Sequence, residues 1–134
     1  MPVRNADLIR ELDLSRDRLD RNPDAGPGAA MTPELARMLD HMVWNYARKP
    51  NFNGYSYLDD MKADALVNLC RVWPKFDPSR QKYPNPFAYF TTCIHRAFLS
   101  VIEHEKKAAT IRDDLMEQNG FQGSYNRQVE NATV

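Results

Sequence analysis

The stretch TPELARMLDHMVWNYARKP, residues 32–50, decides the fold class, because it combines a helix start signal with a helical apolar period. Thr32 offers a side-chain oxygen as an N-cap, and Pro33 follows at the first turn, where its missing N–H does no harm. Six apolar residues then share one helix face: Leu35, Met38, Leu39, Met42, Val43 and Tyr46. Pro50 ends the pattern, so the stretch predicts one amphipathic core helix.

Two further helices are predicted downstream. Ser56 opens the first of them, with Asp59 three residues later near its positive end. Its buried face is Met61, Ala65, Leu69 and Val72. Asn85-Pro86 repeats the cap-and-proline signal and opens a long helix, which no Gly or Pro interrupts before Gly120. Its apolar side is Phe90, Cys93, Ile94, Ala97, Phe98, Val101 and Ile102. Because no strand-like alternation occurs, we expect an all-α fold with a small three-helix core.

The flanking composition predicts how the chain is divided. Residues 1–21 have leucines at helical spacing and are expected to form a helical N-terminal arm that can detach. Residues 22–31, rich in Gly, Pro and Ala, are expected to be a flexible linker. The helical domain then covers residues 32–118, and the polar residues 119–134 form a flexible tail.

Charge is unevenly distributed although the formal net charge is zero. Residues 70–112 carry eight Lys and Arg against three Asp and Glu, whereas residues 113–134 carry one against four. Phosphate binding depends on the local field, so a basic segment is compatible with a nucleic-acid partner; a solvated basic helix face would give the same pattern. No apolar window long enough to span a membrane is present, and Cys70 and Cys93 are expected to be buried thiols in a reducing cytosol.

No group of residues predicts catalysis. His41, His95 and His104 lack metal-ligand spacing, and glycine-rich phosphate loops and nucleophile elbows are absent. Asp59, Asp60 and Asp64 fit a solvated acidic helix face better than a cation site. We therefore expect a protein that is not an enzyme, with no catalytic residue, no metal and no cofactor.

Aromatic and basic residues alternate through residues 75–96. The set is Lys75, Phe76, Arg80, Lys82, Tyr83, Phe87, Tyr89, Phe90, His95 and Arg96. Such a mixture suits single-stranded nucleic acid, where bases stack on rings and cations follow the phosphates. The alternative is that the rings fill the core. Phe76, Phe90 and Phe98 are expected in the core, and the pattern leaves Tyr83 and Tyr89 open.

Two runs, NFNGYSYLDDMKADALVNL at 51–69 and KFDPSRQKYPNPFAYFTTCIHRAFLSVIEHEKK at 75–107, resemble the late-transcription sigma factors of T-even-type phages. The shared features are the FN and GY pairs, an acidic helix, an FD dipeptide and the KY-x-NP-x-AY turn before a long helix. The resemblance covers about residues 32–107, and the same stretch is more distantly similar to the second conserved region of housekeeping sigma factors.

The resemblance implies two binding surfaces. In the family, the helix before the FD dipeptide docks on the coiled coil of the largest RNA polymerase subunit; the matching positions are Asp60, Ala63, Asp64 and Val67. The DNA-melting segment of the family matches the basic loop with Arg80 and the residues Lys82, Tyr83, Phe87, Tyr89 and Thr92, near the unpaired nontemplate strand. The upstream part of an AT-rich promoter element would meet His95, Arg96, Leu99 and Ser100.

The implied function is that of a phage late sigma factor in the cytoplasm of an infected bacterium, which binds host polymerase core, recognises a late promoter and helps melt DNA. A co-activator and the phage sliding clamp are further partners in the family, but NRQVENATV, residues 126–134, lacks the clamp motif. Thr92-Cys93 also replaces the tryptophan pair of housekeeping sigmas. Two alternatives stay open: a polymerase-binding regulator (an anti-sigma or co-activator) that does not contact DNA, and a helical assembly protein.

Overall fold

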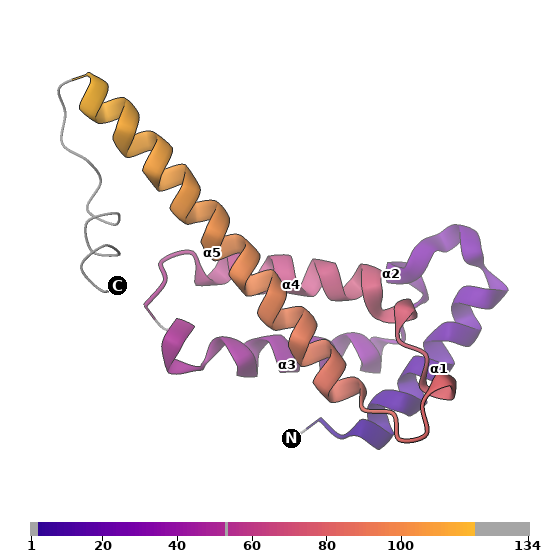
Figure 1. Cartoon of the computed structure of the whole chain (residues 1–134). Helices are drawn as coiled ribbons and strands as arrows, with labels where there is room; N and C mark the ends of the chain where they lie inside the picture. The colour runs from indigo at the N-terminus through magenta and orange to yellow at the C-terminus, as the bar shows by residue number, and fades with distance from the viewer. Residues whose placement is uncertain (1–2, 53, 120–134) are drawn as a thin grey trace. The chain divides into compact units, whose positions relative to one another are not determined.

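The computed structural model describes residues 3–52 and 54–119 of the 134-residue chain. Its α-helices, shown in Figure 1, are α1 (Asn5–Arg21), α2 (Gly26–Ala30), α3 (Pro33–Ala47), α4 (Leu58–Val72) and α5 (Pro86–Gln118). Short 3-10 turns occur at Pro23–Ala25, Pro50–Phe52, Trp73–Lys75 and Pro78–Arg80. No strand occurs in these residues, so the expected all-α class is confirmed.

The contacts divide the chain into two units, Met1–Phe98 and Leu99–Val134, so the boundary falls inside α5. In the first unit α3 and α4 lie side by side (Figure 1), and residues 86–98 of α5 pack on α3 through the rings of Tyr46 and Phe98, whose centroids are 5.5 Å apart. The largest fully buried side chains of this unit include Leu35, Leu39, Met61, Leu69, Trp73, Phe90, Ile94 and Phe98. This differs from the predicted division, which placed one domain over residues 32–118.

Helix α1 belongs to this core, so its prediction as a detachable arm is wrong. Leu8 and Leu12 are 0% and 1% exposed, and α1 contacts both α2 and α3. The guanidinium of Arg16 donates hydrogen bonds to the carbonyls of Pro74 and Phe76, at 2.8 and 2.6 Å. The helical leucine spacing was visible in the sequence, but its burial against the rest of the chain was not.

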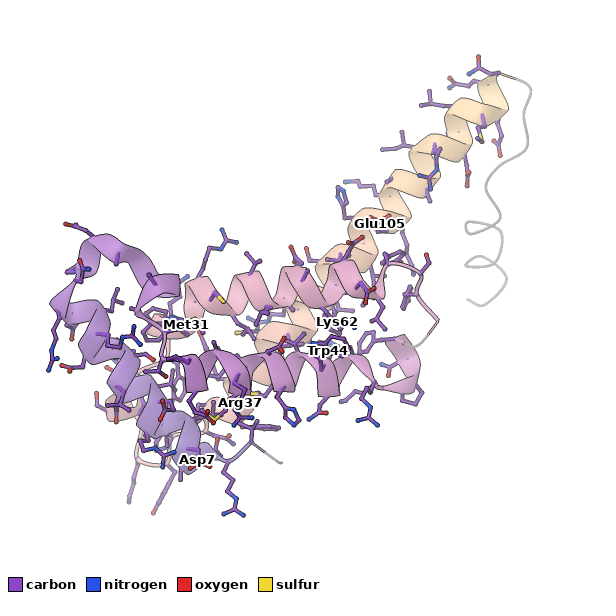
Figure 2. All side chains as sticks on the ribbon, turned by 180° about the vertical axis from the view of Figure 1, so that it is seen from behind. Asp7, Met31, Arg37, Trp44, Lys62 and Glu105 are labelled. Carbon is purple, nitrogen blue, oxygen red and sulfur yellow. The ribbon has the colours of Figure 1, made fainter. Side chains whose placement is uncertain are left out.

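The segment predicted as a flexible linker is also structured. It turns through Pro23–Ala25 and α2, and Ala30 and Met31 are buried. Figure 2 labels Met31, which follows α2. Gly26 has a φ of 83°, a conformation that glycine adopts without the steric cost of a side chain. The indole Nε1 of Trp73 donates to the carbonyl of Pro27 at 3.0 Å, which attaches the segment to the end of α4.

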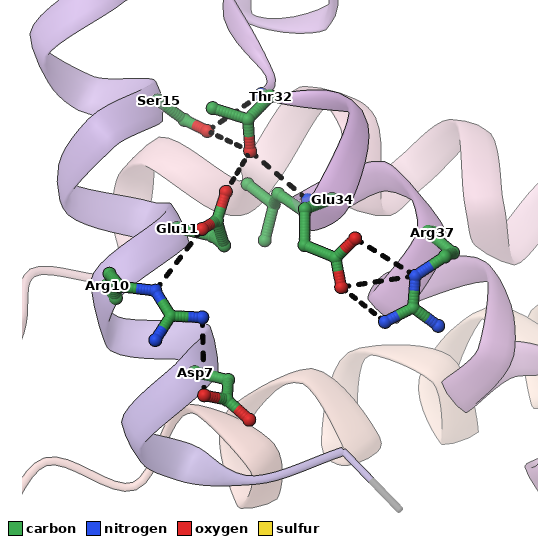
Figure 3. A network of polar contacts seen from close by, with 8 residues as sticks. Asp7, Arg10, Glu11, Ser15, Thr32, Glu34 and Arg37 are labelled. Atoms are coloured by element: carbon green, nitrogen blue, oxygen red, sulfur yellow. Dashed lines mark hydrogen bonds and ion pairs between the residues drawn. The ribbon is translucent and has the colours of Figure 1, made fainter. Parts of the chain in front are cut away.

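The start of α3 confirms the predicted cap and extends it into a network with α1 (Figure 3). The Oγ1 of Thr32 accepts from the backbone N–H of Leu35 at 3.2 Å and donates to the carboxylate of Glu11 at 2.8 Å. The backbone N–H of Thr32 donates to the hydroxyl of Ser15 at 3.0 Å. One threonine therefore joins two helices as well as capping one.

We predict that Thr32→Ala lowers the free energy of unfolding by about 1–2 kcal/mol, the usual cost of losing an N-cap oxygen. The loss should fall in the upper part of this range, because Glu11, only 8% exposed, also loses its donor. Urea unfolding followed by circular dichroism measures it. Thr32→Ser keeps the oxygen and should retain most of the stability; equal losses for the two variants would show that the methyl group matters and the cap does not.

The remaining helix limits agree with the predictions except at α4. Helix α5 begins at Pro86, as predicted, and ends at Gln118. Helix α4 begins at Leu58 rather than at Ser56, because the chain forms a turn there and Tyr57 takes the N-cap position without a side-chain cap. The two cysteines are free and half-buried, and burial raises the pKa of both thiols.

The second unit contains the part of α5 from Leu99 to Gln118, in which Ile102, Ala109 and Asp113 are buried. The predicted flexible tail lies outside the described residues except for Asn119. Across residues 3–52 and 54–119, no helix combines the length and apolar character needed to cross a membrane.

Candidate functional site

The four positions matched to polymerase docking lie on one exposed face of α4. Asp60, Ala63, Asp64 and Val67 follow the spacing i, i+3, i+4 and i+7, and all four are exposed, Val67 by 57%. Among the described residues, neither Asp60 nor Asp64 forms an ion pair; their neighbour Asp59 pairs with Lys62 at 3.1 Å. The face thus presents two unneutralised carboxylates beside an apolar side chain.

The basic loop between α4 and α5 is held in shape by Asp77. Its carboxylate accepts from the backbone N–H of Ser79 at 3.0 Å and from the hydroxyl of Ser79 at 2.6 Å. These hydrogen bonds, the one from the hydroxyl most of all, lower the pKa of Asp77. Arg80 lies 3.5 Å from the same carboxylate, with its side chain 85% exposed. The carboxylate thereby orders the loop while the guanidinium remains accessible.

Helix α1 anchors both ends of this loop. Arg16 binds the carbonyls of Pro74 and Phe76 before it, as described above. After it, the side chain of Asn5 donates to Asn85 at 3.1 Å and accepts from the backbone N–H of Phe87 at 3.0 Å. Asn85 itself accepts from the N–H of Ala88 at 3.1 Å, which is the predicted cap. Sequence reasoning missed Asn5 and Arg16, because no local pattern marks a contact some 60 or 80 residues away.

The aromatic residues of the segment separate into buried and exposed rings. Phe76 and Phe90 are 3% and 0% exposed, as expected for core residues. Tyr89 is half-buried, and its ring centroid lies 5.2 Å from that of Phe76 and 5.4 Å from that of Phe90. Burial is the main cause that raises the pKa of Tyr89. Tyr89 is therefore attached to the core by one face, and the sequence could not determine this.

Tyr83 and Phe87 are the exposed Tyr and Phe rings of residues 75–96. Tyr83 is 82% exposed and Phe87 is 43% exposed. The ammonium of Lys82 lies 5.6 Å from the centroid of the Tyr83 ring, within the range of a cation–π contact. A ring with an adjacent cation is the combination that binds a base and its phosphate in single strands.

A cleft of about 300 Å³ adjoins Phe87. It is lined by Val3, Met42, Asn45, Tyr46, Lys49, Phe87 and Thr91. The ammonium of Lys49 lies 4.5 Å from the centroid of the Tyr46 ring. The volume is at the lower end of the range for small-ligand sites, and the lining combines aromatic walls with a few polar groups. Sequence reasoning assigned Tyr46 to the core face and did not consider Asn45 or Lys49 for this role.

The next turns of α5 present mixed polar groups. Thr92, His95 and Arg96 are exposed, and the hydroxyl of Thr92 donates back to the carbonyl of Ala88 at 3.0 Å. The hydroxyl of Tyr46 is hydrogen-bonded to Nδ1 of His95 at 2.5 Å. Burial raises the pKa of Tyr46, so this phenol keeps its proton at neutral pH. Leu99 and Ser100, which belong to the second unit, are also exposed.

In the described part of the chain, no group of three or more His, Cys, Asp or Glu side chains is placed to hold a metal ion. Comparison with known proteins gives no match among family models, curated proteins or solved structures.

Proposed function

We propose that this chain is a late sigma factor of the T-even phage type, which binds the host RNA polymerase core, directs it to an AT-rich late promoter and helps to open the duplex. The observation that supports this most is the presence of two different exposed surfaces on residues 1–98. One is the acidic face of α4, and the other is the basic loop with its two free rings. A regulator that binds only polymerase would need the first surface and not the second.

The acidic face is proposed to dock on a basic coiled coil of the largest polymerase subunit. Complementary charges of this kind accelerate encounter and fix orientation more than they add affinity. The exposed Val67 contributes an apolar contact one helical turn beyond Asp64. The protein catalyses no reaction itself in this proposal, takes no cofactor and acts in the cytoplasm of the infected host, while nucleotide addition belongs to the polymerase.

The loop and the start of α5 are proposed to hold the melted nontemplate strand. Arg80 and Lys82 follow its phosphates, and Tyr83 and Phe87 stack on unpaired bases, with Tyr89 and Thr92 beside them. The cleft next to Phe87 offers room for one base that has left the stack. His95 and Arg96, and independently Leu99 and Ser100, are proposed to contact the promoter element.

Binding of the purified protein to purified bacterial core polymerase tests the first half of the proposal. Fluorescently labelled protein is titrated with core enzyme, and the complex is then given AT-rich late-promoter templates and nucleotides. The proposal expects a saturable complex and defined transcription starts. A complex without starts would instead support the regulator, and the absence of any complex would contradict both.

We predict that the double change Tyr83→Ala and Phe87→Ala reduces promoter opening by about 30-fold or more, because each of the two stacked bases contributes roughly 1–3 kcal/mol. Binding to core polymerase should stay within about twofold, since these exposed side chains belong to the loop and to α5 and not to the α4 face. Opening is measured with a fluorescent base analogue in the promoter. Leu14→Ala, which removes a 50% exposed apolar side chain from α1, is the matched control.

A further inference from the structure

A hollow between α3 and α4 adjoins the acidic α4 face, with which it shares Ala63, and has no role in the function proposed above. Its volume is about 270 Å³. It is lined by Asp40 and Trp44 of α3 and by Asp59, Lys62, Ala63 and Leu66 of α4. Trp44 is 53% exposed, which is unusual for so large an apolar side chain. Exposed tryptophans of this kind are frequent among the residues that dominate protein interfaces.

The hollow already contains one cation of the protein's own. The ammonium of Lys62 lies 3.4 Å from the centroid of the Trp44 ring and 3.1 Å from the carboxylate of Asp59, and the two labelled side chains, Trp44 and Lys62, meet between neighbouring helices in Figure 2. The Lys62 side chain is 14% exposed, whereas that of Asp59 is 95% exposed. The ring of Trp44 and the carboxylate of Asp59 therefore lie beside each other, and both are partly exposed to solvent. Together they favour binding of a cation.

The surroundings of the hollow are acidic. Asp40 and Asp59 line it, and Ala63 belongs both to the hollow and to the α4 face that carries Asp60 and Asp64. Within this set four carboxylates face one ammonium group. Charge complementarity therefore favours a basic partner over an acidic or apolar one.

We propose that the hollow receives one arginine side chain from a basic helix of the partner that lies along α4. The planar guanidinium stacks on Trp44, pairs with Asp59 and displaces the ammonium of Lys62 from the ring. Arginine fits better than lysine because its guanidinium stacks on aromatic faces and binds a carboxylate with two parallel hydrogen bonds. The identity of the partner as polymerase core rests on the proposed function; the chemistry of the hollow does not.

The proposal makes opposite predictions for two neighbouring substitutions. Trp44→Ala removes the stacking face and should weaken binding of core polymerase by about 3- to 30-fold, the range of a cation–π contact. Trp44→Tyr should recover most of the affinity. Lys62→Met removes the competing internal cation and frees Asp59, so it should strengthen binding by about 2- to 10-fold. A merely structural role for the Trp44–Lys62 contact would make both substitutions weaken binding.

Two titrations by fluorescence anisotropy test this, each on the full chain after circular dichroism has shown that the variants are folded. The first uses purified core polymerase. The second uses a labelled helical peptide of alanine and arginine, with an alanine–glutamate peptide as the control. The expected result is Trp44 dependence in both titrations and tighter binding with Lys62→Met.

The outcomes separate the two proposals. If core binds but Trp44→Ala changes neither titration, the hollow is not a binding site and the proposed function stands. If core does not bind while the arginine peptide binds with Trp44 dependence, the sigma-factor proposal fails and the hollow remains a site for a basic helix. If neither probe binds, or if Lys62→Met weakens binding as much as Trp44→Ala does, the proposal for the hollow is overturned.

Discussion

The double charge reversal Asp60→Lys and Asp64→Lys should weaken binding to core polymerase by about 100-fold or more, because like charges brought together at an interface cost several kcal/mol. Both aspartates are exposed on α4 and have no ion pair among the described residues to lose, so the fold itself should be little affected. The loss should be largest at low salt, where charges are least screened. Anisotropy titration at two salt concentrations measures both effects.

The matched control for this reversal is Asp13→Lys together with Asp20→Lys. These aspartates are exposed on α1, and the net charge changes by the same amount. The control should bind core polymerase within a few-fold of the unchanged protein. If both double variants lose binding equally, only the total charge matters and the α4 face is not a specific docking surface. If neither loses binding, the docking assignment is wrong.

Trp73→Ala should produce the largest loss of stability, about 3–5 kcal/mol, which is a large share of the 5–15 kcal/mol typical of a whole protein. Trp73 is 0% exposed at the end of α4, where its removal leaves a cavity. It also removes the hydrogen bond that joins α4 to the segment before α3. The measurement is urea unfolding followed by circular dichroism.

Trp73→Phe separates the two contributions to this loss. The phenyl ring fills most of the site but leaves the carbonyl of Pro27 without its donor, so about 1–3 kcal/mol should be lost. If Trp73→Ala lowers the free energy of unfolding by less than about 1 kcal/mol, its effect is that of an ordinary surface substitution. Residues 22–31 would then be detached from the core, as the sequence alone suggested.

Local signals in the sequence were sufficient for the helices with clear start signals. Pro33 and Pro86 each begin a helix, and the side chains of Thr32 and Asn85 before them cap it as predicted. The continuation of α5 to Gln118 also followed from the absence of Gly and Pro. These features depend on residues three or four positions apart, which a single sequence displays directly.

The role of α1 could not be predicted in the same way. Its apolar stripe is narrow, and its attachment depends on polar contacts such as Glu11 with Thr32 and Arg16 with Phe76. These contacts join residues that are far apart in the sequence, so they stabilise α1 only in the folded chain. The Gly- and Pro-rich composition of residues 22–31 indicated a flexible linker. In the structure the segment is ordered instead by the burial of Met31 and by the hydrogen bond from Trp73 to the carbonyl of Pro27.

The candidate surfaces were predicted only in part. The i, i+3, i+4, i+7 spacing was enough to put Asp60 and Val67 on one face, since it follows from helix geometry. Core and strand-contacting rings have the same chemistry, so the sequence left Tyr83 and Tyr89 undecided. The structure exposes Tyr83 and sets Tyr89 against Phe76. The cleft beside Phe87 and the hollow at Trp44 arise where helices meet, and no local pattern marks either.

Permanganate mapping of unpaired thymines tests the central proposal most directly. Purified core polymerase and this protein are incubated with supercoiled AT-rich late-promoter DNA, and reactive thymines are located in both strands. The proposal predicts a short reactive stretch around the promoter element that needs both proteins and is lost with Tyr83→Ala and Phe87→Ala. A complex that forms on core polymerase but leaves every thymine unreactive would contradict the proposal that this chain acts as a sigma factor.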